Sequence, residues 1–150
     1  MTYQTIYSSE SATPMQMDDL EEILQHARSS NARKGITGAL VYVDGVFLQI
    51  LEGDTEIVQE LMATISRDVR HETITVLKQG EIPAAIFKDW KMAYVSATPE
   101  QVAKWAGLSG ITAIPDILSD MRNDPLKATQ VAQSILSVLA NKSETGPGAE

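Results

Sequence analysis

The side chains of this sequence that could do chemistry are polar or oxidisable groups placed in segments that otherwise look like core. Gln49 interrupts the apolar run 46–51, Tyr7 lies near the end of the β-branched and aromatic segment 3–8, and Asn31 falls where a helix-like stretch should end. A buried carboxamide must find partners for its donors and acceptors, and a phenol can give up an electron. Each also has a plain structural explanation, because an amide can simply satisfy a strand or close a helix.

A group of basic side chains is expected at the end of a second helix. Arg67, Arg70 and His71 follow the apolar stripe of that helix. They could hold a small anionic ligand, or they could only complement the negative end of the helix dipole.

The common catalytic motifs are missing from this sequence. It has no Gly-x-Ser-x-Gly elbow, P-loop, His-Glu-x-x-His or Gly-x-Gly-x-x-Gly pattern, and it has no cysteine for zinc or nucleophilic chemistry. His26 is expected on a helix surface. Glu52 and Asp54 flank Gly53 after a strand, which suggests an acid/base or metal pair or, as we favour, a turn followed by a helix N-cap. We therefore expect no catalytic turnover.

The composition describes an acidic chain of the size of one domain. Its 150 residues carry a formal net charge of −8, which repels phosphate backbones and anionic membrane surfaces. We therefore expect neither nucleic acid nor a membrane as a partner. No apolar run approaches the roughly 20 residues that span a bilayer, and the N-terminus lacks the features of a signal peptide. A cytoplasmic location is the expectation.

The clearest local pattern is a β-hairpin over residues 37–52. Asp44-Gly45 favours a two-residue turn, which sets Val43 opposite Val46 and Leu40 opposite Gln49. The two faces then carry Leu40, Tyr42, Phe47, Gln49 and Leu51 on one side, and Ala39, Val41, Val43, Val46, Leu48 and Ile50 on the other. Because both faces are apolar, the sheet must be covered on both sides.

The remaining periodicity predicts an α+β, ferredoxin-like fold with the order βαββαββ. Further strands are expected at residues 3–8, 72–79 and 90–96, the last with Trp90, Met92 and Tyr94 on one face. One helix is expected from an N-cap at Asp18 to about Asn31. A second follows an N-cap at Asp54 and carries the stripe Ile57, Val58, Leu61, Met62 and Ile65.

The residues after 97 are expected to cover the second face of the sheet. Thr98, Pro99 and Gln101 form a capping box that begins a helix through Val102, Trp105 and Leu108. A short helical turn is expected at 114–121. The last helix should start at Asp124-Pro125 and bury Ala132, Ile135, Leu136 and Leu139.

Taken together, these residues resemble the BLUF family of flavin-based blue-light sensors. The similarity covers about residues 3–95 in the family's order and spacing. It runs through Ile6-Tyr7-Ser8-Ser9, Asn31, Gly35-Ile36-Thr37-Gly38, Tyr42, Asp44-Gly45, Phe47-Leu48-Gln49-Ile50-Leu51-Glu52-Gly53, Asp68-Val69-Arg70-His71 and Trp90-Lys91-Met92. The resemblance implies a flavin-binding domain at 1–97. The helices that follow are expected to form a cap of the same domain at 98–140, and the small, polar residues 141–150 are expected to be disordered.

The resemblance also implies a role for each candidate residue. Tyr7 corresponds to the tyrosine that donates an electron and then a proton to the photoexcited flavin, and Gln49 to the glutamine that bridges them. Asn31 corresponds to the amide that bonds the pyrimidine edge of the ring. Trp90 and Met92 correspond to a pair of which one lies next to the glutamine, and the sequence leaves open which. The residues expected at the phosphates of FAD are Arg67, Arg70 and His71.

The function implied is a photosensory switch that signals to an unknown partner protein through the C-terminal helices. A homo-oligomer, a dimer or larger, is also expected. Two alternatives stay open from the sequence: a ferredoxin-like regulatory module that binds a small molecule without photochemistry, and a small oxygenase on the same fold. Absorption of visible light by a bound pigment would distinguish the photosensory switch from the first alternative. Consumption of a substrate in the dark would distinguish it from the second.

Overall fold

A computed structural model of the chain describes residues 2–11, 16–67, 71–110 and 113–141. The strands are β1 (Thr2–Ser11), β2 (Thr37–Val43), β3 (Val46–Gly53), β4 (His71–Ile82) and β5 (Ala93–Ser96). The helices are α1 (Met17–Lys34), α2 (Thr55–Ser66), α3 (Pro99–Trp105), α4 (Ile114–Asn123) and α5 (Pro125–Asn141).

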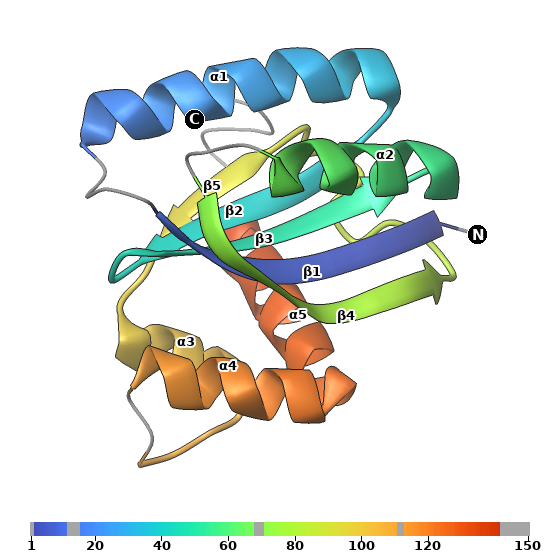
Figure 1. Ribbon diagram of the computed structural model, residues 1–150. Coiled ribbons are helices and arrows are strands. Elements are labelled where there is room, and N and C mark those ends of the chain that lie inside the picture. The colour runs from blue at the N-terminus through green and yellow to red at the C-terminus, as the bar shows by residue number, and fades with distance from the viewer. Residues whose placement is uncertain (1, 12–15, 68–70, 111–112, 142–150) are drawn as a thin grey trace.

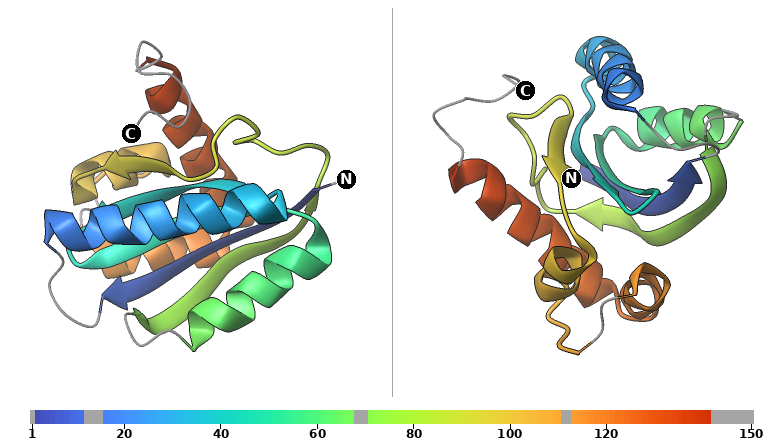
Figure 2. Two further views of the ribbon diagram at one scale, coloured as in Figure 1. Left: turned by 90° about the horizontal axis from the view of Figure 1, so that it is seen from above. Right: turned by 90° about the vertical axis from the view of Figure 1, so that its left-hand side faces the viewer.

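The strands form one mixed sheet in the order β4-β1-β3-β2-β5. β5 runs parallel to β2, whereas the other neighbours are antiparallel. Helices α1 and α2 lie side by side on one face, and α3, α4 and α5 lie against the other (Figures 1 and 2). The α+β, ferredoxin-like fold predicted from the sequence is therefore confirmed, with its extra strand and its second helical layer.

The β2–β3 hairpin has the predicted register. Asp44 and Gly45 have φ of 51° and 79°, as a turn matched to the strand twist requires. Val43 pairs with Val46, and Leu40 pairs with Gln49. Since this register fixes which side chains share a face, the predicted division of the hairpin into two apolar faces is also confirmed.

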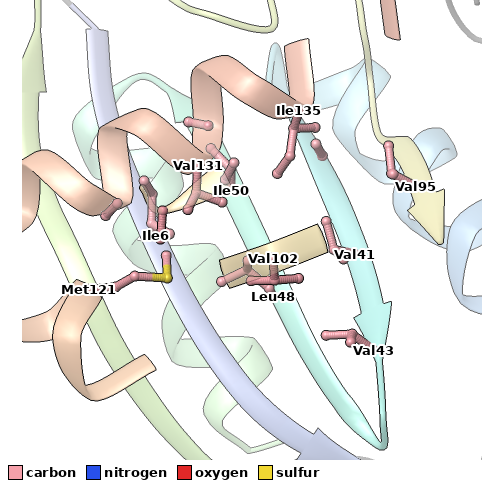
Figure 3. Close-up of a cluster of buried hydrophobic side chains, with 14 of the residues drawn as sticks. Ile6, Val41, Val43, Leu48, Ile50, Val95, Val102, Met121, Val131 and Ile135 are labelled. Atoms are coloured by element: carbon pink, nitrogen blue, oxygen red, sulfur yellow. The ribbon is translucent and has the colours of Figure 1, made fainter. Parts of the chain in front are cut away.

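Two hydrophobic cores lie on the two faces of the sheet. The larger one, which we call the cap core, joins the sheet to α3, α4 and α5 (Figure 3). Its members include Ile6, Val41, Leu48, Ile50, Val102, Met121, Val131 and Ile135. The smaller one, the α1–α2 core, contains Tyr7, Leu20, Leu24, Ile36, Leu40, Phe47, Leu51, Val58 and Met92.

Helix α1 differs from its predicted bounds at both ends. Its N-cap is Gln16 and not Asp18, and the Gln16 N–H donates to the Asp19 carboxylate at 3.1 Å. The helix continues past Asn31 to Lys34 and ends at Gly35, whose φ of 69° is readily adopted only by glycine. Asn31 therefore lies within the last turn of the helix, where its side chain is free to project toward the sheet.

Strand β5 is shorter than predicted, and the prediction that Trp90, Met92 and Tyr94 share a face was wrong. The connection 83–92 turns before it enters the sheet: Trp90 N–H donates to Phe87 O, and Trp90 O accepts from Gly38 N, both at 2.9 Å. Strand alternation does not apply to that turn. Trp90 is buried in the cap core, while Met92 and Tyr94 belong to the α1–α2 core.

The capping predictions for the other helices are confirmed. Asp54 accepts from Glu56 N at 3.1 Å, and Thr98 and Gln101 form the reciprocal capping box. Helix α3 ends at Trp105, so Leu108 follows the helix, and α4 extends beyond the short turn that was expected. The tail was expected to be disordered from Asn141, but Asn141 is the last residue of α5; the rest of that tail, from 142 onward, lies outside the described residues.

Candidate functional site

A cavity of about 190 Å³ lies between α1, α2 and the sheet face that carries Gln49. Apolar side chains supply most of its wall, and a few amides, hydroxyls and cations lie among them. The lining residues are Ile23, His26, Ala27, Ser30, Asn31, Lys34, Leu40, Phe47, Gln49, Leu51, Leu61, Thr64, Ile65 and Met92.

Tyr7, Gln49 and Met92 form a continuous chain of contacts, of which Gln49 and Met92 line this cavity and Tyr7 does not. The Tyr7 hydroxyl donates to Gln49 Oε1, and Gln49 Nε2 donates to Met92 Sδ at 3.5 Å. Tyr7 is fully buried and Gln49 is 9% exposed. The register explains the first contact, because Tyr7 and Gln49 are direct partners across the β1–β3 pair. A phenol and a carboxamide therefore share one hydrogen bond in a largely dry environment.

Asn31 reaches the same cavity from the last turn of α1. It is 2% exposed, and its Nδ2 donates to Lys91 O at 2.7 Å. One side of the amide thus holds the backbone of Lys91, just before β5, while the residue also lines the cavity. A buried amide held in this way is oriented before any ligand binds.

The basic residues predicted at the phosphates are not brought into this cavity by the described part of the structure. Arg67 is exposed at the C-cap of α2. Arg70 lies outside the described residues, and of His71 only the backbone, at the start of β4, is described. His26, expected on a helix surface, is exposed and lies at the cavity rim.

The sequence reasoning missed several residues of the site. Arg28 Nε donates to Met92 O at 2.9 Å, and Lys34 lines the cavity. Helical spacing could have found the lining residues, because Ile23, Ala27, Asn31 and Lys34 recur three or four positions apart on one face of α1. No local pattern could have found Arg28, since its partner is 64 residues away in the sequence.

Glu52 is neither an acid/base group of this cavity nor a metal ligand with Asp54. It is fully buried on the opposite side of the sheet, where its carboxylate accepts from Gln4 Nε2, Ile86 N and Phe87 N at 3.1, 3.0 and 2.8 Å. Lys78 Nζ donates to Gln4 Oε1 at 2.7 Å, and burial lowers the pKa of Lys78 although nearby Glu52 opposes that shift. Within the described ranges, no group of three or more His, Cys, Asp or Glu side chains could hold a metal ion.

The shape and chemistry of the cavity fit a flat conjugated ring with a polar edge. Leu40, Phe47 and Leu51 are apolar lining residues, and Asn31 and Gln49 add amides to the lining that can both donate and accept. An isoalloxazine has this combination of an apolar face and an edge of carbonyls and ring nitrogens. The residues present therefore fit the ring of a flavin.

No helix within the described ranges has the length and apolarity needed to cross a membrane.

Comparison with known proteins gives the same family from sequence and from structure. Residues 2–93 match the family described as BLUF, sensors of blue light using FAD. The β subunit of the photoactivated adenylate cyclase of Euglena gracilis is 33% identical over 106 residues, which cover 70% of this chain but 12% of that protein. The chain thus spans about a tenth of the length of such curated relatives.

Solved structures resemble most of the chain. The dark-state structure of BlrB, a BLUF protein, superposes with a TM-score of 0.72 at 27% identity, covering 91% of this chain and 96% of that one. The ground state of BlsA gives a TM-score of 0.66 at 34% identity over 73% of this chain and 75% of that one. With a family match over more than half of its length and a fold shared with these proteins, the chain belongs to the BLUF family of blue-light sensors.

Proposed function

We propose that this chain senses blue light by a reversible transfer of an electron and a proton from Tyr7 to bound FAD, which rearranges the hydrogen bonds of Gln49. The observation that carries this proposal is the hydrogen bond from the Tyr7 hydroxyl to Gln49 at the wall of the cavity. It supplies an oxidisable group and a reorientable amide in direct contact. The family supports a flavin, and the choice of FAD is part of the proposal.

The side chains that would hold the ring are Asn31 and Gln49, with Leu40 and Phe47 against its face. Asn31 is already oriented by its bond to Lys91 O, so it can present its amide to the polar edge of the ring without further ordering. We assign the phosphates to Arg70 and His71, with Arg67 as an outer contributor. Guanidinium and imidazole donors suit a diphosphate, and all three follow α2 in the sequence.

When bound, a flavin would supply under blue light an oxidant strong enough to take an electron and a proton from a nearby phenol, and Tyr7, hydrogen-bonded to Gln49, would provide both. Tyr7 then loses the O–H that holds Gln49 Oε1. Without that donor the amide of Gln49 can rotate or tautomerise, and it leaves its weak bond to Met92 Sδ. When the electron and the proton return to Tyr7, the amide is left in a new hydrogen-bonded arrangement. Nothing is consumed, so the cycle is a switch without turnover.

The changed amide must bias an element with two arrangements to act as a signal. Met92 contacts Gln49 directly and precedes β5, and β5 leads into α3 within two residues. We therefore assign the output to β5 and to the helical cap at residues 98–140. The output itself is altered binding to a partner protein or an altered homo-oligomer.

The decisive experiment is a light-minus-dark absorption difference spectrum of protein purified in the dark. We expect a flavin spectrum that shifts slightly to the red in blue light and returns in the dark. A colourless protein, or a flavin spectrum that does not shift, would show that the proposal is wrong. Release of the pigment by heat, followed by chromatography against FAD and FMN standards, identifies the flavin.

A further inference from the structure

Helix α1 is attached to the sheet by few buried side chains. Of its 18 residues, the buried ones are Leu20, Leu24 and Asn31, and the cavity lies beneath the helix. On the β5 side, two side chains of α1 donate to backbone carbonyls: Arg28 Nε to Met92 O at 2.9 Å, and Asn31 Nδ2 to Lys91 O at 2.7 Å. These bonds join α1 to the residues that immediately precede β5.

The backbone carbonyls of three consecutive residues before β5 each accept a hydrogen bond from elsewhere in the chain. Trp90 O accepts from Gly38 N, Lys91 O from Asn31 and Met92 O from Arg28. The β2–β5 ladder begins only at Ala93, which pairs with Ala39. The Arg28 side chain therefore fixes Met92 where the sheet itself does not yet do so.

Met92 is held at both of its ends. Its carbonyl accepts from Arg28, and its sulfur accepts from Gln49 Nε2 at 3.5 Å. A methionine side chain has three rotatable bonds, so the position of its sulfur is defined only if its backbone is fixed. A bond from a charged donor to a carbonyl is stronger than a neutral one, and the thioether is a weak acceptor. The backbone bond is thus the stronger of the two.

We propose that Arg28 is a positioning residue that holds Met92 against Gln49 and so sets the dark orientation of the Gln49 amide. The part concerning the photocycle rests on the function proposed above, whereas the placement of Met92 does not. In this arrangement α1, and not only β5, senses the state of Gln49, because a displacement of Met92 pulls on Arg28.

The test compares Arg28→Met with Arg33→Met in flavin-loaded protein kept in the dark. Arg33 is exposed on the same helix and reaches only Ser29 Oγ at 3.5 Å among the contacts described, so its variant controls for loss of one charge from α1. The readout is the methyl resonance of Met92 in protein labelled with ¹³C-methyl methionine, assigned through Met92→Leu. In Arg28→Met we expect this resonance to move toward that of a mobile methionine, and in Arg33→Met we expect no change.

Arg28→Lys serves as the conservative variant, because an ammonium can donate to the same carbonyl. It should return the Met92 resonance most of the way to its original position. If Arg28→Met does not fold, Arg28→Asn takes its place, because its shorter amide stops short of the Met92 carbonyl. A mobile Met92 resonance in Arg28→Asn supports the positioning role, and a resonance unchanged from the parent overturns it. A Met92 resonance that is the same in the parent and in Arg28→Met, or that moves equally in Arg33→Met, would also overturn the proposal.

The photocycle gives the second readout. Without its backbone bond Met92 no longer offers a fixed acceptor to the Gln49 amide in its dark orientation, so recovery in the dark should be about fivefold slower in Arg28→Met. If the parent protein shows no light-induced shift, the proposed function fails, but the methyl resonances still decide the role of Arg28. If the shift is normal and neither readout responds to Arg28→Met, the positioning role alone fails.

Discussion

Tyr7 and Gln49 are direct partners across the β1–β3 pair, and the phenol donates to the amide oxygen. The amide nitrogen faces Met92 Sδ, which is a weak acceptor. One end of the Gln49 side chain is therefore held firmly and the other loosely. The hydroxyl proton of Tyr7 is what distinguishes the two orientations of the amide.

The first prediction concerns that proton. In Tyr7→Phe we expect flavin to stay bound, because the ring of the side chain still fills the core, and we expect the light-induced red shift to disappear. Loss of one neutral hydrogen bond should change stability by only about 1 kcal/mol. Tyr3→Phe is the matched control, since Tyr3 belongs to the same strand and core and its hydroxyl contacts Gln79 at 3.3 Å. A normal shift in Tyr7→Phe would contradict the assignment.

The second prediction concerns the amide. Gln49→Leu keeps the approximate volume of the side chain but leaves the Tyr7 hydroxyl without its acceptor. We expect the variant to bind flavin and to show no reversible shift in the difference spectrum. Gln79→Leu, at an exposed position of β4, should photocycle like the parent. A variant at position 49 that cycles normally would mean that the amide is not the switch.

Much of this site could be predicted because it depends on one turn. Asp44-Gly45 fixes the hairpin register, the register fixes the faces, and the faces place Gln49 beside Leu40 and Phe47. The same reasoning placed the two helical layers, because a hairpin that is apolar on both faces needs two covers. The covers were found as predicted.

The failures share a different physical origin. The path of residues 83–92 is set by long-range bonds from Glu52, Gly38 and Asn31, none of which strand alternation can show. Trp90 was therefore placed on the wrong face. Arg28 was missed for the same reason. Asn31 was expected to end the first helix, but the helix continues for three more residues and is ended by Gly35.

The third prediction separates Met92 from Trp90. Met92→Leu should change the rate of dark recovery, because it removes the sulfur that Gln49 contacts. It should lower the free energy of unfolding by less than about 1.5 kcal/mol. Trp90→Phe should leave the spectrum and the recovery unchanged but lower stability by about 1–3 kcal/mol, because Trp90 packs in the cap core. Flash photolysis and urea denaturation of both variants provide the measurement. The opposite pattern would place Trp90, and not Met92, at the amide.

The fourth prediction concerns alkaline pH. Burial lowers the pKa of Lys78 below its ordinary 10.5, while Glu52 partly opposes this. Between the lowered pKa and 10.5 the unfolded chain binds more protons than the folded one, so the free energy of unfolding should rise with pH in that window. The same stability is lost as the pH falls through the pKa of the folded state. Urea denaturation from pH 8 to pH 10 should show that rise.

The controls for this effect are Lys78→Met and the exposed Lys88→Met. The alkaline rise should vanish in the first and persist in the second. Burial raises the pKa of Tyr94 above its ordinary 10.0, so the folded state loses stability as the pH rises above that value. The comparison therefore ends at pH 10. A rise that survives Lys78→Met would exclude Lys78 as its source.

The fifth prediction concerns Glu52, which lies three residues after Gln49 on β3 but faces the other side of the sheet. Its carboxylate accepts from the backbone of Ile86 and Phe87, within the connection 83–92 that leads to Met92. Glu52→Ala leaves these buried donors without their acceptor and should cost about 3 kcal/mol in urea denaturation. Glu52→Gln should cost less, because one oxygen remains, while the exposed Glu60→Gln should change stability by less than about 0.5 kcal/mol.

Hydrogen exchange tells this anchoring role apart from a general loss of stability. Under native conditions the amides of Ile86 and Phe87 should exchange faster in Glu52→Gln than in the parent, while the amides of the β1–β3 pair stay protected. Because Trp90 N–H bonds to Phe87 O, loosening should spread along the connection toward Met92. If the amides at 86 and 87 keep their protection in Glu52→Ala, the carboxylate does not hold this segment, and the path of the connection must depend on the packing of Phe87 and on the bonds from Gly38 and Asn31.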